Sequence, residues 1–329
     1  MCAINGITKD DEAQIVRMNA LTHHRGPDGT SIYRDGKITL GHNRLAIIDT
    51  SDASAQPMKS NDGRYVIVYN GELYNFRELR TELASHYEFK TEGDTEVLLA
   101  SYIIWGTEMF AKLRGIFAFG IWDTKTEELV LARDHMGVKP LYYTINGDVL
   151  SFSSEMPALV TRERKTLDMQ RVGFYLGMEY VPGPNTLVRE VLKLQPGYIL
   201  KFKDGVCSTA SYKTEETFTD TKTKDDIYTT IDTAVQRQLV SDRPVGAYLS
   251  GGFDSSIVVH HMTKHSPQVR TYSVDFEAVT GQEGDSLKFN EDAKLAEKTA
   301  QFYGTQHKKL TIGIQDIRGS LETAIASAS

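Results

Sequence analysis

The sequence predicts two domains: a first half that mixes α-helices with antiparallel β-sheet, and a second half that opens as a parallel α/β sheet. Three observations predict this arrangement. Strand and hairpin patterns dominate up to residue 212, an almost wholly polar, threonine-rich stretch occupies residues 213–226, and a β–α–β pattern follows. We therefore expect a first domain at 1–212, a linker at 213–226 and a second domain at 227–329.

The first half mixes strand and helix patterns along its length. RYVIVYNG is typical of a strand, whereas NFRELRTELA and TEVLLASYIIWG repeat apolar residues every three or four positions, as helices do. Two hairpins follow, IFAFGIWD-TKTE-ELVLARD and LYYTI-NG-DVLSFSS, and the Asn146-Gly147 pair suits the tight turn of the second. This domain should therefore contain much antiparallel sheet.

The second half begins with a helical pattern in DIYTTIDTAVQRQL. After it come a strand, PVGAYL, a glycine turn, a helix, SSIVVHHMTKH, and a second strand, VRTYSVDF. Two strands joined by a helix predict a parallel pair. A further helix is expected around NEDAKLAEKTAQFYG.

Composition and charge exclude several classes of protein. A hydrophobic content of 40% and a charged content of 25% are those of a globular chain, and no apolar run approaches the ~18 residues of a membrane helix. A net charge of -7 without a basic run argues against general nucleic-acid binding. The start has no apolar signal core, and two cysteines make no disulfide scaffold, so we expect a cytoplasmic protein without membrane attachment.

The second residue is a cysteine, within the opening stretch MCAINGI. Removal of Met1, which a small second residue favours, would give Cys2 a free α-amine beside its thiol. Such an amine has an ordinary pKa of roughly 7.7–8.0 and can act as the base that activates the thiol. The alternative is that Cys2 is a small residue in a partly buried first strand. Cys207, in a stretch of turn and strand, is expected to be structural.

The glycine turn SGGFDSS, residues 250–256, lies between a predicted strand and a predicted helix. Paired glycines let backbone N–H groups approach an anion at a helix N-terminus, and the serines add hydroxyl donors. Asp254 among these donors makes sense as a ligand of a phosphate-bound Mg²⁺. The lysine of a Walker loop is lacking, and the string resembles the PP-loop of ATP pyrophosphatases. An ordinary glycine turn capped by serine and aspartate is the alternative.

An N-terminal cysteine followed by an SGGxDSS domain resembles the glutamine-hydrolysing asparagine synthetases, in which a class II glutamine amidotransferase domain precedes a PP-loop synthetase domain. The resemblance implies an N-terminal-nucleophile fold, which is an αββα sandwich, followed by an α/β domain of the adenine nucleotide α-hydrolase type. It is carried by CAINGI, HRGPDG at 24–29, GHNRLAIID at 41–49, YNGELYNFRELR at 69–80, GDTEVLL at 93–99, LRGIFAFGIWD at 113–123, LARDHMGVKPLYY at 131–143 and SGGFDSS.

The resemblance implies a glutamine site in the first domain. Cys2 would attack the side-chain amide of glutamine, and the Asn70 amide and the Gly71 N–H would form an oxyanion hole. The substrate would be held by Arg44 at its α-carboxylate, by Glu72 and Asp94 at its α-ammonium, and by backbone groups of Leu45, Ala46, Ile47 and Ile48. HRGPDG is expected to be an active-site loop without an assigned role for each residue.

Each of these residues also has a structural alternative. Arg44 could be a surface charge at a strand end, and Asp94 could be the N-cap of the helix TEVLLASYIIWG. Asn70-Gly71 could be a hairpin turn. Their joint occurrence with Cys2 favours the glutamine site.

In the second domain the resemblance implies an ATP site. ATP would activate aspartate as β-aspartyl-AMP with release of pyrophosphate, and ammonia from the first site would convert the activated carboxylate to asparagine. A homodimer is also compatible with the family. The implied ATP ligands are Tyr248, Leu249, Ser250, Gly251, Gly252, Asp254, Ser255, Ser256 and Val274, with Asp254 also holding Mg²⁺.

Three other functions stay open at this point. The chain ends at ETAIASAS, before an acidic glycine-rich motif and a later lysine of this family, so we expect an incomplete synthetase domain and a chain that alone hydrolyses glutamine but makes little asparagine. A related amidotransferase could amidate another carboxylate, in surface-sugar or natural-product synthesis. A non-catalytic regulatory protein is the third alternative, against which the presence of Cys2, Arg44, Asn70 and Asp94 argues.

Overall fold

The structure is a computed structural model that describes residues 1–160, 166–213, 223–277 and 283–327. The chain divides into two compact units, Met1–Thr217 and Phe218–Ser329, which are described one at a time. Most of the linker expected at 213–226 lies outside the described residues. Its last three residues are not linker, because they form the first turn of a helix that Thr223 and Asp226 cap reciprocally.

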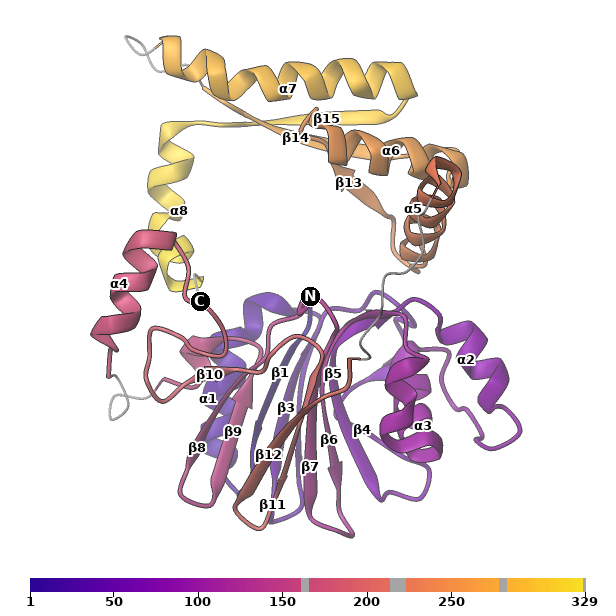
Figure 1. The fold of residues 1–329 in the computed structure, drawn as a ribbon, viewed down its shortest axis with the longest axis vertical. Helices are drawn as coiled ribbons and strands as arrows, with labels where there is room; N and C mark the ends of the chain where they lie inside the picture. Colours follow the sequence, from indigo (N-terminus) through magenta and orange to yellow (C-terminus); the bar gives the residue numbers. More distant parts are fainter. Residues whose placement is uncertain (161–165, 214–222, 278–282, 328–329) are drawn as a thin grey trace. The chain divides into compact units, whose positions relative to one another are not determined.

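The first unit consists of two six-stranded antiparallel sheets that pack face to face, with helices outside them (Figure 1). The strand orders are β10-β8-β9-β1-β3-β2 and β12-β11-β7-β6-β5-β4. The first sheet contains Ala3–Ile7 (β1), Gly29–Arg34 (β2), Thr39–Arg44 (β3), Tyr142–Asn146 (β8), Val149–Ser153 (β9) and Leu192–Lys193 (β10). The second contains Met58–Lys59 (β4), Tyr65–Leu73 (β5), Gly115–Asp123 (β6), Glu128–Arg133 (β7), Tyr198–Lys203 (β11) and Val206–Ser211 (β12).

Helices cover the outer faces of the two sheets (Figure 1). The helix at Glu12–Thr22 packs with the first sheet through Ile15 and Met18, and the helix at Asp94–Trp105 packs against β5 of the second sheet. The αββα sandwich that the resemblance implied is therefore confirmed. The α-helices of this unit are Glu12–Thr22 (α1), Phe76–Leu83 (α2), Asp94–Trp105 (α3) and Met169–Met178 (α4), with 3-10 turns at His23–Arg25 (η1), Asp52–Ser54 (η2), Gly106–Ala111 (η3) and Met156–Ala158 (η4).

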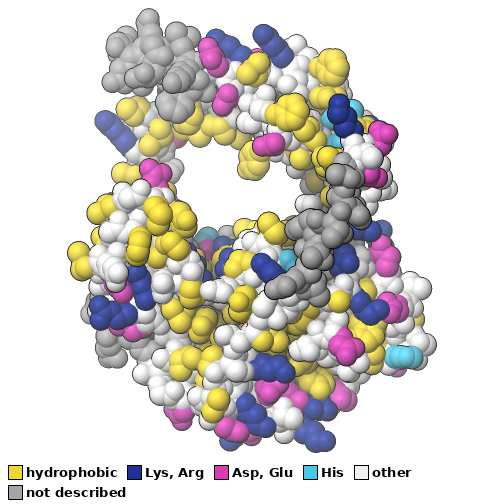
Figure 2. Space-filling model, viewed as in Figure 1, with side chains coloured by type: hydrophobic (Ala, Val, Ile, Leu, Met, Phe, Trp, Pro, Cys, Tyr) yellow, Lys and Arg dark blue, Asp and Glu magenta, His cyan; other side chains and the backbone are white. Residues whose placement is uncertain are grey.

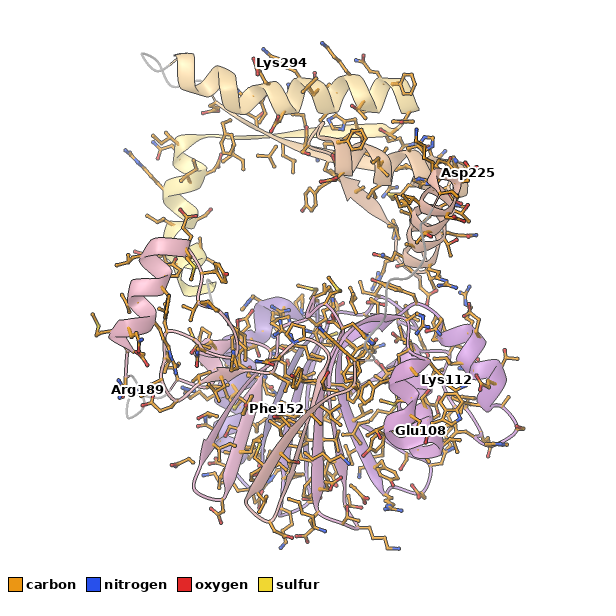
Figure 3. The ribbon with its side chains drawn as sticks, in the orientation of Figure 1. Glu108, Lys112, Phe152, Arg189, Asp225 and Lys294 are labelled. Carbon is orange, nitrogen blue, oxygen red and sulfur yellow. The ribbon has the colours of Figure 1, made fainter. Side chains whose placement is uncertain are left out.

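Alternation along the strands decides which side chains fill the space between the sheets. Ile4 of β1, Leu40 of β3 and Val68 of β5 are fully buried there in one cluster. Phe152 of β9, labelled in Figure 3, belongs to the same cluster. Its ring lies where a Cβ on Gly6 would fall, only 2.1 Å away, so a glycine on β1 makes room for the ring.

The strand β5, the helices α2 and α3 and both hairpins follow the sequence predictions. One detail of the second hairpin was wrong. Asn146 ends β8, and the two turn residues are Gly147 and Asp148, with Gly147 at φ +59°. A glycine with positive φ at the first turn position is typical of a type II′ turn. The helices α1 and α4 and the strands β2 and β3 were not predicted.

The second unit contains a parallel sheet with the order β13-β14-β15. The predicted β–α–β unit is confirmed as β13, α6 and β14. Alternate residues of the sheet face α6 and α7, whereas Tyr248, Val274, Phe276 and Leu310 lie on the other face and are exposed, as expected for a parallel sheet covered on one side only. The elements are Lys224–Gln238 (α5), Gly246–Tyr248 (β13), Phe253–His265 (α6), Arg270–Phe276 (β14), Glu283–Tyr303 (α7), Gln306–Ile312 (β15) and Ile314–Ser327 (α8).

Hydrophobic side chains also reach the surface of the first unit. Figure 2 shows them gathered over α4, where Met169 and Leu176 are 72% and 78% exposed. Among the described helices, none combines the length and the apolar character needed to cross a bilayer.

Gly6→Ala should destabilise the first unit by about 1–3 kcal/mol, because its methyl group would overlap the Phe152 ring between the sheets. Gly29→Ala on β2 is the matched control, since a Cβ there meets no atom within 4 Å. Urea unfolding of the three proteins measures the difference. Equal midpoints for Gly6→Ala and Gly29→Ala would contradict the packing described here.

Candidate active site

The inward-facing rows of two strands, β3 and β5, end in polar residues at the same end of the sandwich. On β3, His42 and Arg44 follow Leu40 at alternate positions, and Arg44 lies close to the start of β1, where Ala3 pairs with Asn43. On β5, Asn70 and Glu72 follow Val68 in the same way. Because alternate residues of a strand share a face, the rows that build the apolar core also deliver these polar groups.

A cleft opens at this end of the sandwich, with about 370 Å³ of empty space including its open part. It brings together every residue expected in the glutamine site except Asn70, which lies fully buried below the surface. Four residues without an expected role also line it, namely Ser54, Gln56, Tyr69 and Thr95. The expected residues in its lining are Cys2, Arg44, Leu45, Ala46, Ile47, Ile48, Gly71, Glu72 and Asp94.

The Cys2 thiol lies against the backbone of Leu45. Its Sγ accepts a hydrogen bond from the Leu45 N–H at 3.3 Å and lies 3.6 Å from the Leu45 carbonyl oxygen. Burial raises the pKa of the thiol, while the Leu45 N–H and the charge of Lys139 act in the opposite direction. The segment that follows β3 therefore fixes the position of the sulfur.

One edge of β5 is free of a partner strand within the cleft. β4 begins at Met58, opposite Ile67, so the residues of β5 beyond that pair have no strand on this side. Side chains take the place of a strand: the Tyr69 N–H donates to Gln56 Oε1 at 2.6 Å, and the Leu73 N–H donates to Asp94 Oδ2 at 2.9 Å.

Gly71 lies between these two donors on the same edge. Because alternate residues of an antiparallel strand direct their N–H groups to the same side, the Gly71 N–H also points there. We find no hydrogen-bond acceptor for it among the described residues. A side chain at this position is excluded, since a Cβ would lie 2.4 Å from the Ile116 carbonyl oxygen. Within the described part of the chain, the Gly71 N–H is therefore an unpaired backbone donor of the cleft.

The Asn70 side chain is a second unpaired polar group. It is completely buried, and neither its Nδ2 nor its Oδ1 has a hydrogen-bond partner among the described residues. Leaving an amide buried without a partner costs roughly 1–3 kcal/mol, so such groups are uncommon outside functional sites. Asn70 and Gly71 lie inside β5, and the alternative of a hairpin turn at this pair is therefore wrong.

Arg44 is half-buried at the end of β3, and its guanidinium donates to the carbonyl oxygens of Asp49 at 2.5 Å and Ser51 at 2.7 Å. Asp49 organises this loop, with φ +46° and a carboxylate that accepts from Ser51, Ser54 and the Glu92 N–H. Burial disfavours its ionisation, but these hydrogen bonds outweigh burial and lower the pKa of Asp49 to about 2. Arg44 thus lies at a strand end, as the structural alternative predicted. It is not a mobile surface charge, however, because two backbone carbonyls hold its guanidinium.

Two carboxyl groups in the cleft resist ionisation. Burial, together with the neighbouring Asp94, raises the pKa of Glu72 to about 8. Burial raises the pKa of Asp94 to about 6, although the Leu73 N–H and the Tyr69 hydroxyl, at 3.0 Å, donate to it. Asp94 is not the N-cap of α3, because the helix begins at Asp94 and Gly93 is the cap. A cation between the two carboxyls would favour their charged forms.

Sequence reasoning missed the residues whose hydrogen bonds position the backbone of Cys2. Arg25, within HRGPDG, donates from Nε to the Cys2 carbonyl oxygen at 3.2 Å and from Nη1 to Glu155 Oε1 at 2.9 Å. The same oxygen of Glu155 also binds His24 Nε2 at 3.0 Å. The HRGPDG motif drew attention to Arg25, but Glu155 lies 130 residues farther along the chain and has no local sequence signal.

Lys139 was also missed, although it lies in the quoted stretch LARDHMGVKPLYY. Its side chain is only 5% exposed, and the carboxylate of Asp134 fixes its backbone N–H at 3.0 Å. Burial lowers its pKa, while Glu72 and Cys2 act to raise it. Lys139 is thus a buried cation beside the cleft.

In the second unit, the SGGFDSS loop joins the carboxyl end of β13 to the start of α6. Gly251 has φ +77°, and a Cβ there would lie 2.5 Å from the Leu295 Cβ, so the turn requires glycine. The N–H of Ser250 donates to Ser255 Oγ, and the N–H of Gly252 donates to Ser250 Oγ, both at 3.3 Å. These long internal bonds are easily exchanged for bonds to an anion.

The structure places the other expected ATP ligands around this loop. Tyr248 ends β13, Leu249 extends the pairing by donating to the Tyr272 carbonyl oxygen at 2.7 Å, and Val274 lies on β14. Asp254 is exposed in the first turn of α6. In the described ranges no three side chains of His, Cys, Asp or Glu converge as a metal site, so a Mg²⁺ here would depend on phosphate oxygens beside Asp254.

Two family models match the chain, one after the other. Residues 1–213 match the family described as Glutamine amidotransferase domain, and residues 226–328 match the family Asparagine synthase. The chain is 36% identical to asparagine synthetase [glutamine-hydrolyzing] 1 of Bacillus subtilis (strain 168), over 98% of this chain and 52% of that protein. It is 30% identical to asparagine synthetase B [glutamine-hydrolyzing] of Escherichia coli (strain K12), over 96% of this chain and 55% of that protein.

The chain spans about half the length of these curated relatives. Among solved structures, the fold is similar to that of the allosteric regulatory enzyme of purine biosynthesis, with a TM-score of 0.51 and 14% identity over 96% of this chain and 90% of the other. At that identity the likeness concerns the fold alone. The match over residues 1–213 covers more than half of the sequence. The chain therefore belongs to the glutamine amidotransferase domain family, and its remaining part matches the asparagine synthase family.

Proposed function

We propose that the chain is a glutamine-dependent amidating enzyme, in which the domain expected at 1–212 hydrolyses glutamine and the domain expected at 227–329 binds ATP. The observation that carries this proposal is the cleft itself. It combines the Cys2 thiol, the free Gly71 N–H and the raised-pKa carboxyls of Glu72 and Asp94. The unpaired amide of Asn70 lies beside Gly71 on the same strand.

The glutaminase reaction needs a base for the thiol, and the α-amine of Cys2 would supply it once Met1 is removed. The amine takes the thiol proton, Sγ attacks the side-chain amide carbon of glutamine, and the amine returns the proton to the departing ammonia. Water then hydrolyses the thioester to glutamate. Burial and the charges of Lys139 and Arg25 lower the pKa of the Met1 α-amine, which lies one residue before the proposed base.

The negative charge that forms on the amide oxygen would be stabilised by Asn70 and Gly71. Among the described residues the Asn70 amide has no hydrogen-bond partner, and the Gly71 N–H lies on the edge of β5 beyond β4, so neither donor would have to give up a protein hydrogen bond when the charge develops. Arg44 would bind the α-carboxylate of glutamine with the donors that the carbonyls of Asp49 and Ser51 leave free. Glu72 and Asp94 would bind the α-ammonium.

For the second unit we propose that ATP binds at the SGGFDSS loop, with its phosphates on the N–H groups that start α6 and with Mg²⁺ held by Asp254. A phosphate-bound Mg²⁺ would neutralise charge on the leaving pyrophosphate. We propose aspartate as the carboxylate that is activated, because both relatives named above are asparagine synthetases.

Cys2→Ala should reduce glutamate formation from glutamine to the background of the assay, because the attacking sulfur is lost. Cys207→Ala on β12 is the control and should keep wild-type activity. Glutamate release is measured for the three purified proteins, together with mass spectrometry of the wild-type N-terminus. Activity in Cys2→Ala equal to that of the wild type would remove the assignment.

Glu72→Gln should raise the KM for glutamine roughly 10- to 100-fold at pH 8.5, because one charged partner of the α-ammonium is lost. In the wild type, KM should fall as pH rises from 6 to 8, while Glu72 ionises, and the variant should keep only the smaller change near pH 6 that ionisation of Asp94 causes. Steady-state kinetics across this pH range test the prediction. Glu78→Gln, an exposed carboxyl on α2, is the control. An unchanged KM in Glu72→Gln would contradict the ammonium site.

The same substitution should stabilise the free protein above pH 8. The pKa of Glu72 is raised on folding, so its contribution to stability is present below its unfolded pKa of 4.5 and is lost as pH rises through about 8. Gln at this position avoids the loss. The melting temperature should thus exceed that of the wild type at pH 8.5 and match it near pH 4.

Asp254→Asn should weaken Mg-ATP binding about tenfold or more while leaving metal-free ATP binding unchanged, because a metal ligand loses its charge and the loop donors stay. Titration calorimetry with and without Mg²⁺ separates the two. Asp225→Asn on α5 is a matched control, since Asp225 is also exposed. Equal Mg-ATP affinity in the wild type and Asp254→Asn would exclude the metal role.

A further inference from the structure

His42 is a buried titratable residue that the proposed reaction does not use. It lies on β3, is 1% exposed, and its Nε2 lies 3.2 Å from the Tyr69 carbonyl oxygen on β5 of the opposite sheet. A carbonyl oxygen only accepts, so Nε2 carries the proton in this contact. Burial lowers the pKa of His42 to about 4, and the charge of Arg44 acts in the same direction, so the ring is neutral at physiological pH.

The carbonyl that His42 binds belongs to the peptide unit joining Tyr69 to Asn70. A peptide unit is planar, so fixing its oxygen fixes the orientation of the Asn70 N–H and Cα as well. On this edge of β5 no strand is available to bind the oxygen, because β4 begins opposite Ile67. His42 therefore supplies the hydrogen bond that a neighbouring strand would otherwise give.

The Tyr69 backbone is held on the same edge by a second side chain. Gln56 Oε1 accepts from the Tyr69 N–H at 2.6 Å, and Gln56 Nε2 donates to Thr95 Oγ1 at 3.2 Å. His42 acts from the facing sheet, whereas Gln56 acts from the segment before β4. Together they fix both polar groups of the residue that precedes Asn70.

We propose that His42 is a positioning residue that holds the Tyr69–Asn70 peptide unit, and so keeps the Asn70 amide and the Gly71 N–H aimed at the oxygen of the substrate amide. This rests on the proposed function of the cleft. His42 touches neither the thiol nor the substrate, and it moves no proton. Its effect is confined to the step in which negative charge forms on that oxygen.

His42→Leu should lower kcat for glutamine hydrolysis about 10- to 100-fold while changing KM less than about threefold. Small displacements of a catalytic donor cost this much in rate, and the groups proposed to bind the α-carboxylate and α-ammonium are unchanged. His42→Gln should restore most of kcat, because its side-chain N–H can reach the same carbonyl. The ratio of variant to wild-type kcat should be the same from pH 6 to 9, since His42 does not titrate there.

A second measurement separates positioning from general damage to the site. Alkylation of Cys2 by iodoacetamide requires the thiol but no oxyanion donor, so its rate should be unchanged in His42→Leu. Leu129→Ala, a buried substitution on β7 that should cost about 2–5 kcal/mol, controls for lost stability and should keep wild-type kcat in the folded protein. A parallel loss of kcat and alkylation in His42→Leu, an equal loss of kcat in Leu129→Ala, or no restoration in His42→Gln would overturn the proposal.

Nitrogen NMR of the wild-type protein tests the contact without any variant. It should show His42 neutral and protonated at Nε2 from pH 5 to 9. Protonation at Nδ1 instead would overturn the proposal even if His42→Leu does not fold. Failure of the proposed function is distinguishable, because it would appear as wild-type protein without Cys2-dependent glutamine hydrolysis while the NMR result stands.

Discussion

The structure of the first unit depends on one constraint: two antiparallel sheets face each other, and every second residue of each strand points between them. Toward the middle of the sandwich this rule buries Ile4, Leu40 and Val68. Toward one end the same rows deliver His42 and Asn70. The alternation of side chains along each strand therefore orients both the apolar residues of the core and the polar residues near the cleft.

Much of the fold could be predicted because its signals are local. The strand β5, the helices α2 and α3 and the parallel unit around SGGFDSS each show their own periodicity or turn residues. β3 could not be predicted in this way, since His42 and Asn43 are polar and are nonetheless buried and paired within the unit. Polarity suggests exposure unless the partners are known, and the partners of these residues lie on α1 and β5.

In the candidate site, too, the residues in local motifs could be predicted and the residues contributed by distant segments could not. Cys2, Arg44 and Asp94 stand in short recognisable motifs, and the structure brings them into one cleft. Their supports, such as Glu155 behind Arg25, come from distant parts of the chain, so no spacing rule relates them to the motifs. Asp94 is not the N-cap because α3 begins at Asp94 itself, after Gly93, and no sequence pattern showed that Leu73 and Tyr69 of β5 would donate to its carboxylate.

The unpartnered edge of β5 has a further consequence. An exposed strand edge with free N–H groups is a template on which another polypeptide can add a strand, and proteins usually block such edges. Here side chains occupy the N–H groups on either side of Gly71, because Gln56 binds the Tyr69 N–H and Asp94 binds the Leu73 N–H. The edge therefore offers another chain no continuous row of free N–H groups, and a feature that elsewhere promotes aggregation is blocked by two side chains of the same unit.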